Sequence, residues 1–151
     1  MADRLDVSKN VAEDLANNID RVDMLGMKVG STQRYELLEF AMALGLAKGE
    51  RTSLISKKGF VQDSSFRNKP FESYLYSVAL NELRKDNKEN LISNSDVVYE
   101  IVEEYAQTGF DEIRSMFGDF SEYDEEDCID RMIEKMDEMY AAISESKKDD
   151  A

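Results

Sequence analysis

The chain contains no histidine among its 151 residues. Histidine is the most common general base and a common zinc ligand, so its absence removes every Ser-His or Cys-His nucleophile pair. The seven glycines are scattered and form no phosphate-binding loop of the P-loop or dinucleotide kind. The sequence therefore argues against an enzyme, and we expect neither a catalytic residue nor a cofactor.

Cysteine is almost absent as well, since Cys128 is the single one. One cysteine excludes an internal disulfide framework and suits a reducing cytoplasm. No apolar run approaches the roughly 18–20 residues of a membrane span, and the first residues lack the pattern of a secretory signal. We therefore expect a cytoplasmic protein that does not enter the membrane.

Proline is also scarce, because Pro70 is the only one. Few breaks and many strong helix formers predict a mostly α fold with long regular elements. Apolar spacing predicts helices over 8–22, from 31 or 32 to 45 or 49, from Pro70 to about 83, over 95–109, over 110–117 and over 122–144. In this prediction Ser8 caps the first helix, and Gly109 and Gly118 end the fourth and fifth.

Helical periodicity is lost between residues 50 and 69. Two apolar pairs, Leu54-Ile55 and Phe60-Val61, flank a polar turn at residues 57–59, so a small hairpin-like insertion is expected near 52–63. The predicted architecture is a compact domain of about five helices over 1–118. An acidic amphipathic C-terminal helix with a frayed tail follows over 119–151.

Charge is divided unevenly along the chain, whose net charge is −14. Residues 28–88 carry 11 Lys and Arg against 7 Asp and Glu, whereas residues 89–140 carry 3 against 17. The acidic stretch 119–130 resembles a calcium-binding loop in spacing, but Asp124 replaces the required glycine and Asp130 the bidentate glutamate. We therefore predict no metal site there, and two surfaces with different partners.

The basic middle of the chain offers one candidate surface. Basic residues interleaved with phenylalanines are typical of nucleic-acid binding, although the acidic remainder of the chain repels a polyanion. The candidate residues, called the middle basic set below, are Lys48, Arg51, Lys57, Lys58, Arg67 and Lys69.

The last predicted helix offers the other candidate surface, a methionine-rich apolar stripe. Flexible methionine side chains adapt well to a second protein surface, so the stripe favours a partner or a dimer contact; packing onto its own domain is the alternative. The candidate partner-binding residues are Ile129, Met132, Ile133, Met136, Met139 and Tyr140.

Two helix-end patterns carry a resemblance to a known family. The apolar helix 35–51 ends in Ala-x-x-Leu-Gly-x-x-x-Gly-x-Arg, and residues 101–113 contain Glu-Tyr-Ala-x-x-Gly. Over about residues 32–118, this order resembles small accessory proteins encoded with bacterial DNA phosphorothioation (Dnd) and related phage-defence clusters. The resemblance implies structural roles for Gly45, Gly49, Tyr105 and Gly109, and offers no catalytic residue.

The resemblance and the apolar stripe together predict a non-enzymatic accessory subunit of a bacterial anti-phage defence complex. Its expected partners are larger proteins of the system, an ATPase or a nuclease among them, and a homo-oligomer is left open. Two alternatives remain at this point. One is a nucleic-acid-binding or sensing module with an autoinhibitory acidic tail, and the other is a phage-encoded acidic decoy of a defence protein.

Overall fold

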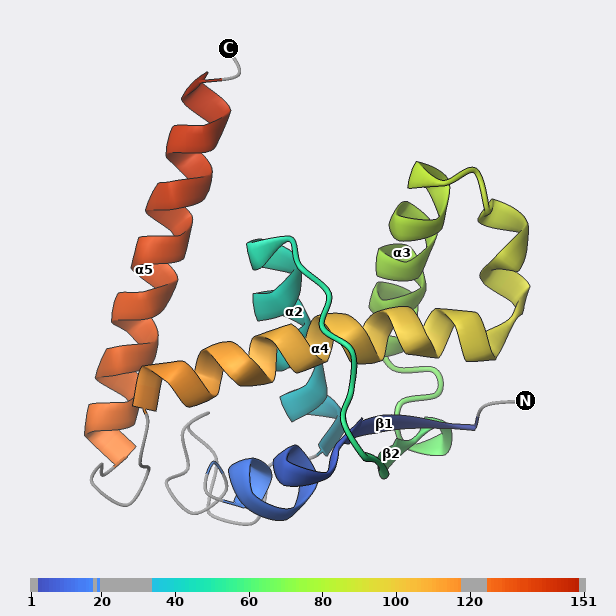
Figure 1. Cartoon of the computed structure of the whole chain (residues 1–151), viewed down its shortest axis with the longest axis horizontal. Coiled ribbons are helices and arrows are strands. Elements are labelled where there is room, and N and C mark those ends of the chain that lie inside the picture. Colours follow the sequence, from blue (N-terminus) through green and yellow to red (C-terminus); the bar gives the residue numbers. More distant parts are fainter. Residues whose placement is uncertain (1–2, 18, 20–33, 118–124, 150–151) are drawn as a thin grey trace.

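Helix α4 (Ser95–Phe117) is the element against which most other elements of this computed structural model are packed. Figure 1 shows it crossing the molecule, with the other helices and a strand pair arranged around it. The structure describes residues 3–17, 19, 34–117 and 125–149. The mostly α architecture confirms the predicted fold class.

The other elements follow in chain order. They are β1 (Arg4–Ser8), the π-helical turn η1 (Val11–Leu15), α2 (Arg34–Lys48), β2 (Lys57–Gln62), the 3-10 turn η2 (Asp63–Ser65), α3 (Pro70–Lys85), the 3-10 turn η3 (Glu89–Ser93) and α5 (Glu125–Asp149).

Two helix ends have the local chemistry that the sequence predicts. Pro70 is the first residue of α3, where its missing N–H costs no hydrogen bond. Helix α2 ends at Lys48 and is followed by Gly49, whose φ of +76° is a left-handed conformation that favours glycine. The Gly49 N–H donates to the Gly45 carbonyl at 3.0 Å and closes the last turn.

The predicted helix break at Gly109 is wrong, and so is the separate helix over 110–117. Helix α4 continues through Gly109 because this glycine lies where α4 crosses α2. A Cβ on Gly109 would overlap the Ala41 carbonyl, and a Cβ on Gly45 would overlap the Tyr105 carbonyl. Close packing of the two backbones outweighs the helix-propensity cost of glycine, about 1 kcal/mol.

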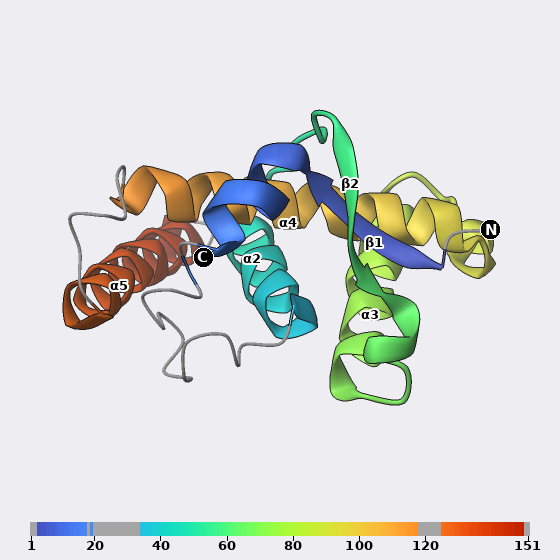
Figure 2. The same cartoon turned by 90° about the horizontal axis from the view of Figure 1, so that it is seen from below.

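The predicted two-stranded element is present, but its strands come from distant parts of the chain. Residues 57–62 form β2, which pairs antiparallel with β1, with Leu5 opposite Val61 and Ser8 opposite Lys57. Residues 57–59 therefore belong to a strand and not to a turn. Figure 2 shows the pair lying over the middle of α4.

The N-terminal strand was not predicted, and it displaces the expected helix start. Ser8 is the last residue of β1 and not a helix cap; helical structure begins at residue 9 and is described to 17 and at 19. Leu5 and Val7 are buried while Arg4 is exposed, which is the alternation of a strand with one face on the core. A strand of five residues gives too short an alternating pattern to be recognised in the sequence.

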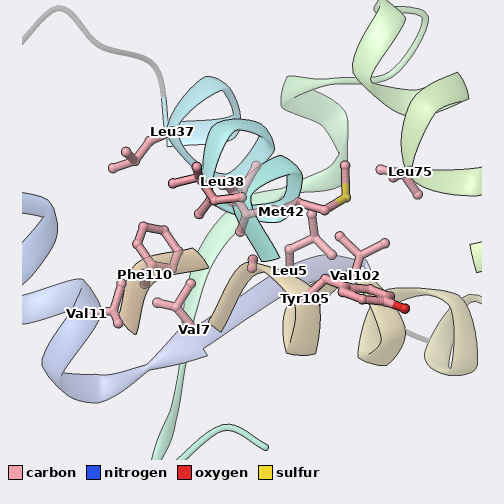
Figure 3. Packing of buried hydrophobic residues seen from close by; sticks show 14 of the residues in the cluster. Leu5, Val7, Val11, Leu37, Leu38, Met42, Leu75, Val102, Tyr105 and Phe110 are labelled. Carbon is pink, nitrogen blue, oxygen red and sulfur yellow. The ribbon is translucent and has the colours of Figure 1, made fainter. Parts of the chain in front are cut away.

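The core fills the space between β1, α2 and α4. Figure 3 shows Leu5 of β1, Leu38 and Met42 of α2, and Val102 and Phe110 of α4 meeting there. Each of these side chains is fully buried. The predicted boundary between residues 118 and 119 and the loop carboxylates up to Asp124 lie outside the described residues.

Candidate functional site

Helix α5 carries the largest group of exposed apolar side chains in the described chain. The exposed fraction is 54% for Ile133, 46% for Met136 and 74% for Tyr140. These three residues, three of the six predicted partner-binding residues, are called the open face of α5. Figure 1 shows α5 standing at the end of α4 and running away from the other elements toward the C-terminus.

Two of the remaining residues of the stripe lie against the protein itself. Met132 is buried, and Met139 is half-buried against the core. Ile129 is also half-buried. The structure therefore divides the predicted stripe: Met132 and Met139 attach α5 to the core, whereas Ile133, Met136 and Tyr140 stay open.

Polar contacts complete the attachment of α5 to the end of α4. The Arg131 guanidinium donates to the Met116 carbonyl at 2.8 Å, near the end of α4 where main-chain carbonyls lack helical partners. Lys135 Nζ lies 3.8 Å from Glu112 Oε2. The same Glu112 carboxylate accepts a hydrogen bond from Lys48, which raises the pKa of that lysine. Glu112 thus joins α2, α4 and α5.

The middle basic set is largely neutralised by carboxylates of the same chain. Arg51 lies 2.5 Å from Glu104 and 3.3 Å from Glu82. Lys58 pairs with Glu13 at 3.0 Å and Arg67 with Asp63 at 3.1 Å.

The other members of the set differ in their surroundings. Lys48 contacts Glu112, as described above, and Lys69 Nζ lies 6.0 Å from the centre of the Tyr35 ring. Lys57 is exposed at the start of β2. Four of the six cations therefore already have an anionic partner, which lowers the positive charge that they offer to a phosphate.

A cavity of about 380 Å³ lies where the end of β1, η1 and residues 52–56 meet α4. Several of its lining residues are joined by hydrogen bonds. The Ser8 hydroxyl donates to Gln107 at 2.7 Å, the Gln107 amide donates to Asp111 at 3.0 Å, and the Ile55 N–H donates to Ser8 at 2.9 Å. These hydrogen bonds connect Ile55 to α4 through Ser8, so these lining groups already have partners within the protein.

A polar line on α4 that holds β1 was not among the predicted site residues. Glu103, Gln107 and Asp111 follow one another at four-residue spacing, which places them on one side of a helix. Glu103 accepts a hydrogen bond from the Asp6 N–H and is 7% exposed. Burial raises the pKa of Glu103 to about 7, although the Asp6 N–H favours the charged form. The four-residue spacing of these polar side chains is a signal that the sequence itself contains.

Among the residues that the structure describes, no group of three or more histidine, cysteine or acidic side chains is arranged to hold a metal ion. Within the same residues, no helix is both long and apolar enough to cross a membrane.

The described chain is thus a mostly helical protein whose last helix presents an open apolar face. It belongs to the family described as DNA sulphur modification system-associated protein 4, whose model matches residues 10–150. This confirms the resemblance and extends it beyond residues 32–118, to include η1 and α5. No curated protein and no solved structure matches the chain.

Proposed function

We propose that this protein is a non-enzymatic accessory subunit that binds another protein of a DNA sulphur modification system through the open face of α5. Family membership supports an accessory role in such a system. The observation that carries the proposal is the exposure of Ile133, Met136 and Tyr140 on one side of a helix anchored on its other side. The family match includes this helix, so α5 belongs to the family's common chain and is not an added tail.

The open face is large enough to contribute measurably to binding. Fully burying a large apolar side chain contributes about 1.5–3 kcal/mol, and these three side chains are about half to three-quarters exposed. Covering them would contribute roughly 3–5 kcal/mol before the cost of association. Tyrosine is also enriched among the residues that dominate interface energies, and Tyr140 is the most exposed of the three.

The resemblance also supports a cellular compartment and a type of complex for this protein. We place the protein in the cytoplasm, in an anti-phage defence complex with larger ATPase or nuclease subunits. The absence of histidine from the chain supports a role without catalysis of its own.

The test replaces apolar side chains that the structure leaves exposed. In Ile133→Ser/Tyr140→Ser, we expect recovery of the co-expressed proteins of the system on the tagged chain to fall at least about tenfold, because the lost apolar burial exceeds 1.4 kcal/mol. Met132 and Met139 stay unchanged because they pack on the protein itself. Quantitative mass spectrometry after nuclease treatment is the measurement.

The matched control is Ile55→Ser, which removes an apolar side chain that is 77% exposed away from α5. This variant should recover the co-expressed proteins as fully as the wild type does. Circular dichroism should show the same helix content in the wild type, the α5 double variant and the control. Undiminished recovery in the α5 double variant would contradict the proposed function.

Direct nucleic-acid binding by the middle basic set is the less favoured proposal, because four of its six cations are paired with carboxylates. A salt-dependent shift of labelled DNA by the full chain, lost in Lys57→Glu/Lys69→Glu, would reverse that order. A phage-encoded acidic decoy is a further rival, supported only by the net charge of −14.

A further inference from the structure

The charged side chains that border the open face of α5 are of one sign. Residues three, four and seven apart share a side of a helix, so Asp130, Ile133, Asp137 and Tyr140 form one row. Asp130 and Asp137 are both exposed. The outer edge of the open face therefore carries two carboxylates, each one turn from an exposed apolar side chain.

The basic residues of the same stretch are held on the other side of the helix. Arg131 donates to the Met116 carbonyl, and Lys135 lies beside Glu112. Both therefore point toward α4, where they attach the helix and border a cavity of about 200 Å³ between α4 and α5. The attachment of α5 thus holds both cations against α4 and leaves the two carboxylates at the open edge.

We infer that the partner surface is an amphipathic helix whose apolar stripe is edged by lysine or arginine. The inference rests on the proposed function, since it names the chemistry of the partner that the open face binds. Apolar side chains of the partner would cover Ile133, Met136 and Tyr140, and its cations would lie against Asp130 and Asp137. Complementary charges at an interface edge select the partner and raise the association rate.

Charge also argues against two other occupants of the open face, a second copy of the chain and an anionic membrane. A second copy of the chain would bring the same acidic edge and a further net charge of −14 to the contact. An anionic membrane surface would meet the same repulsion. The contact is short, because Ile133 and Tyr140 are separated by about two helical turns, roughly 10 Å. A partner helix of about three heptads spans it fully.

Two synthetic peptides test the inference with the full chain. Both are helical, about 21 residues long, with the same leucine and isoleucine stripe; one carries lysine at the edge positions and the other carries glutamate. By fluorescence anisotropy, we expect the lysine-edged peptide to bind at least about tenfold more tightly at low salt. At 1 M salt, where the Debye length is about 3 Å, this preference should fall to about twofold.

Charge reversal at the edge separates a local effect from attraction to an acidic protein. In Asp130→Lys/Asp137→Lys the preference should reverse in favour of the glutamate-edged peptide. The control, Asp86→Lys/Glu89→Lys, makes the same change in net charge at two exposed positions, one just after α3 and one at the start of η3, and should keep the original preference.

Other outcomes would overturn the basic-edged partner or assign the open face to a different occupant. Equal affinity of the two peptides, or an unchanged preference in Asp130→Lys/Asp137→Lys, overturns the basic-edged partner and leaves apolar docking standing. If neither peptide binds, the basic-edged partner is overturned as well. The co-purification of Ile133→Ser/Tyr140→Ser decides the proposed function separately. A dimer of the full chain in sedimentation that Tyr140→Ser dissociates would assign the open face to a second copy.

Discussion

Replacing Gly109 by alanine should lower the free energy of unfolding by about 3 kcal/mol, although alanine is the better helix former. The added Cβ would overlap the Ala41 carbonyl, which belongs to the backbone of α2 and cannot rotate away as a side chain does. The helices must separate, and the core between them loses contacts. Gly45→Ala should have a similar effect through the Tyr105 carbonyl. Urea denaturation followed by circular dichroism measures both.

Gly59→Ala is the matched control, because it adds the same methyl group on strand β2. There the new Cβ would lie 3.1 Å from the flexible side chain of Arg4, which can move. We expect a change within about 1 kcal/mol. A Gly109→Ala protein as stable as the wild type would show that α2 and α4 do not cross as closely as described.

Glu103 should make the stability of the protein fall as the pH rises toward neutrality. Its pKa is about 7 in the folded protein, against an ordinary value of 4.5 for a glutamate. A raised carboxyl pKa means that the folded state prefers the protonated form, so this contribution is complete below pH 4.5 and is lost as the pH rises through 7. The full loss is about 3 kcal/mol, at 1.36 kcal/mol per pKa unit.

The comparison of wild type with Glu103→Gln isolates this effect from the other carboxylates. The chain has a pI near 4.4, so the measurement belongs above that pH, where the protein stays charged. Between about pH 5.5 and 8.5 we expect the variant to gain about 2 kcal/mol relative to the wild type. Asp96→Asn, at an exposed position on the same helix, controls for removal of a carboxylate as such. A parallel pH dependence in wild type and Glu103→Gln would contradict the assignment.

Much of the helical content could be predicted because it rests on local signals. Pro70 starts α3 for a reason that lies in its own ring, and Gly49 ends α2 for a reason that lies in its own backbone. The stripe on the last helix was likewise readable from spacing alone. The match of residues 10–150 to the family model confirms that the quoted motifs pointed to the right class of protein.

The predictions that failed concern groups whose partners are distant in the sequence. Gly109 has the local signature of a helix end, yet Ala41 on another helix makes it a point of close approach. Residues 57–59 have the signature of a turn, yet the strand that pairs with them lies about fifty residues earlier. In each case a contact between remote segments outweighed the local preference.

The sequence alone determined the mostly α class, the division of charge, the absence of histidine chemistry and the apolar stripe of the last helix. These follow from composition and from periodicity along the chain, which need no knowledge of neighbours in space. Only the tertiary structure decided which residues of that stripe stay open, which cations are already paired, and that Glu103 is buried. Burial and pairing depend on segments that folding brings together, and a pattern read along one chain does not contain that information.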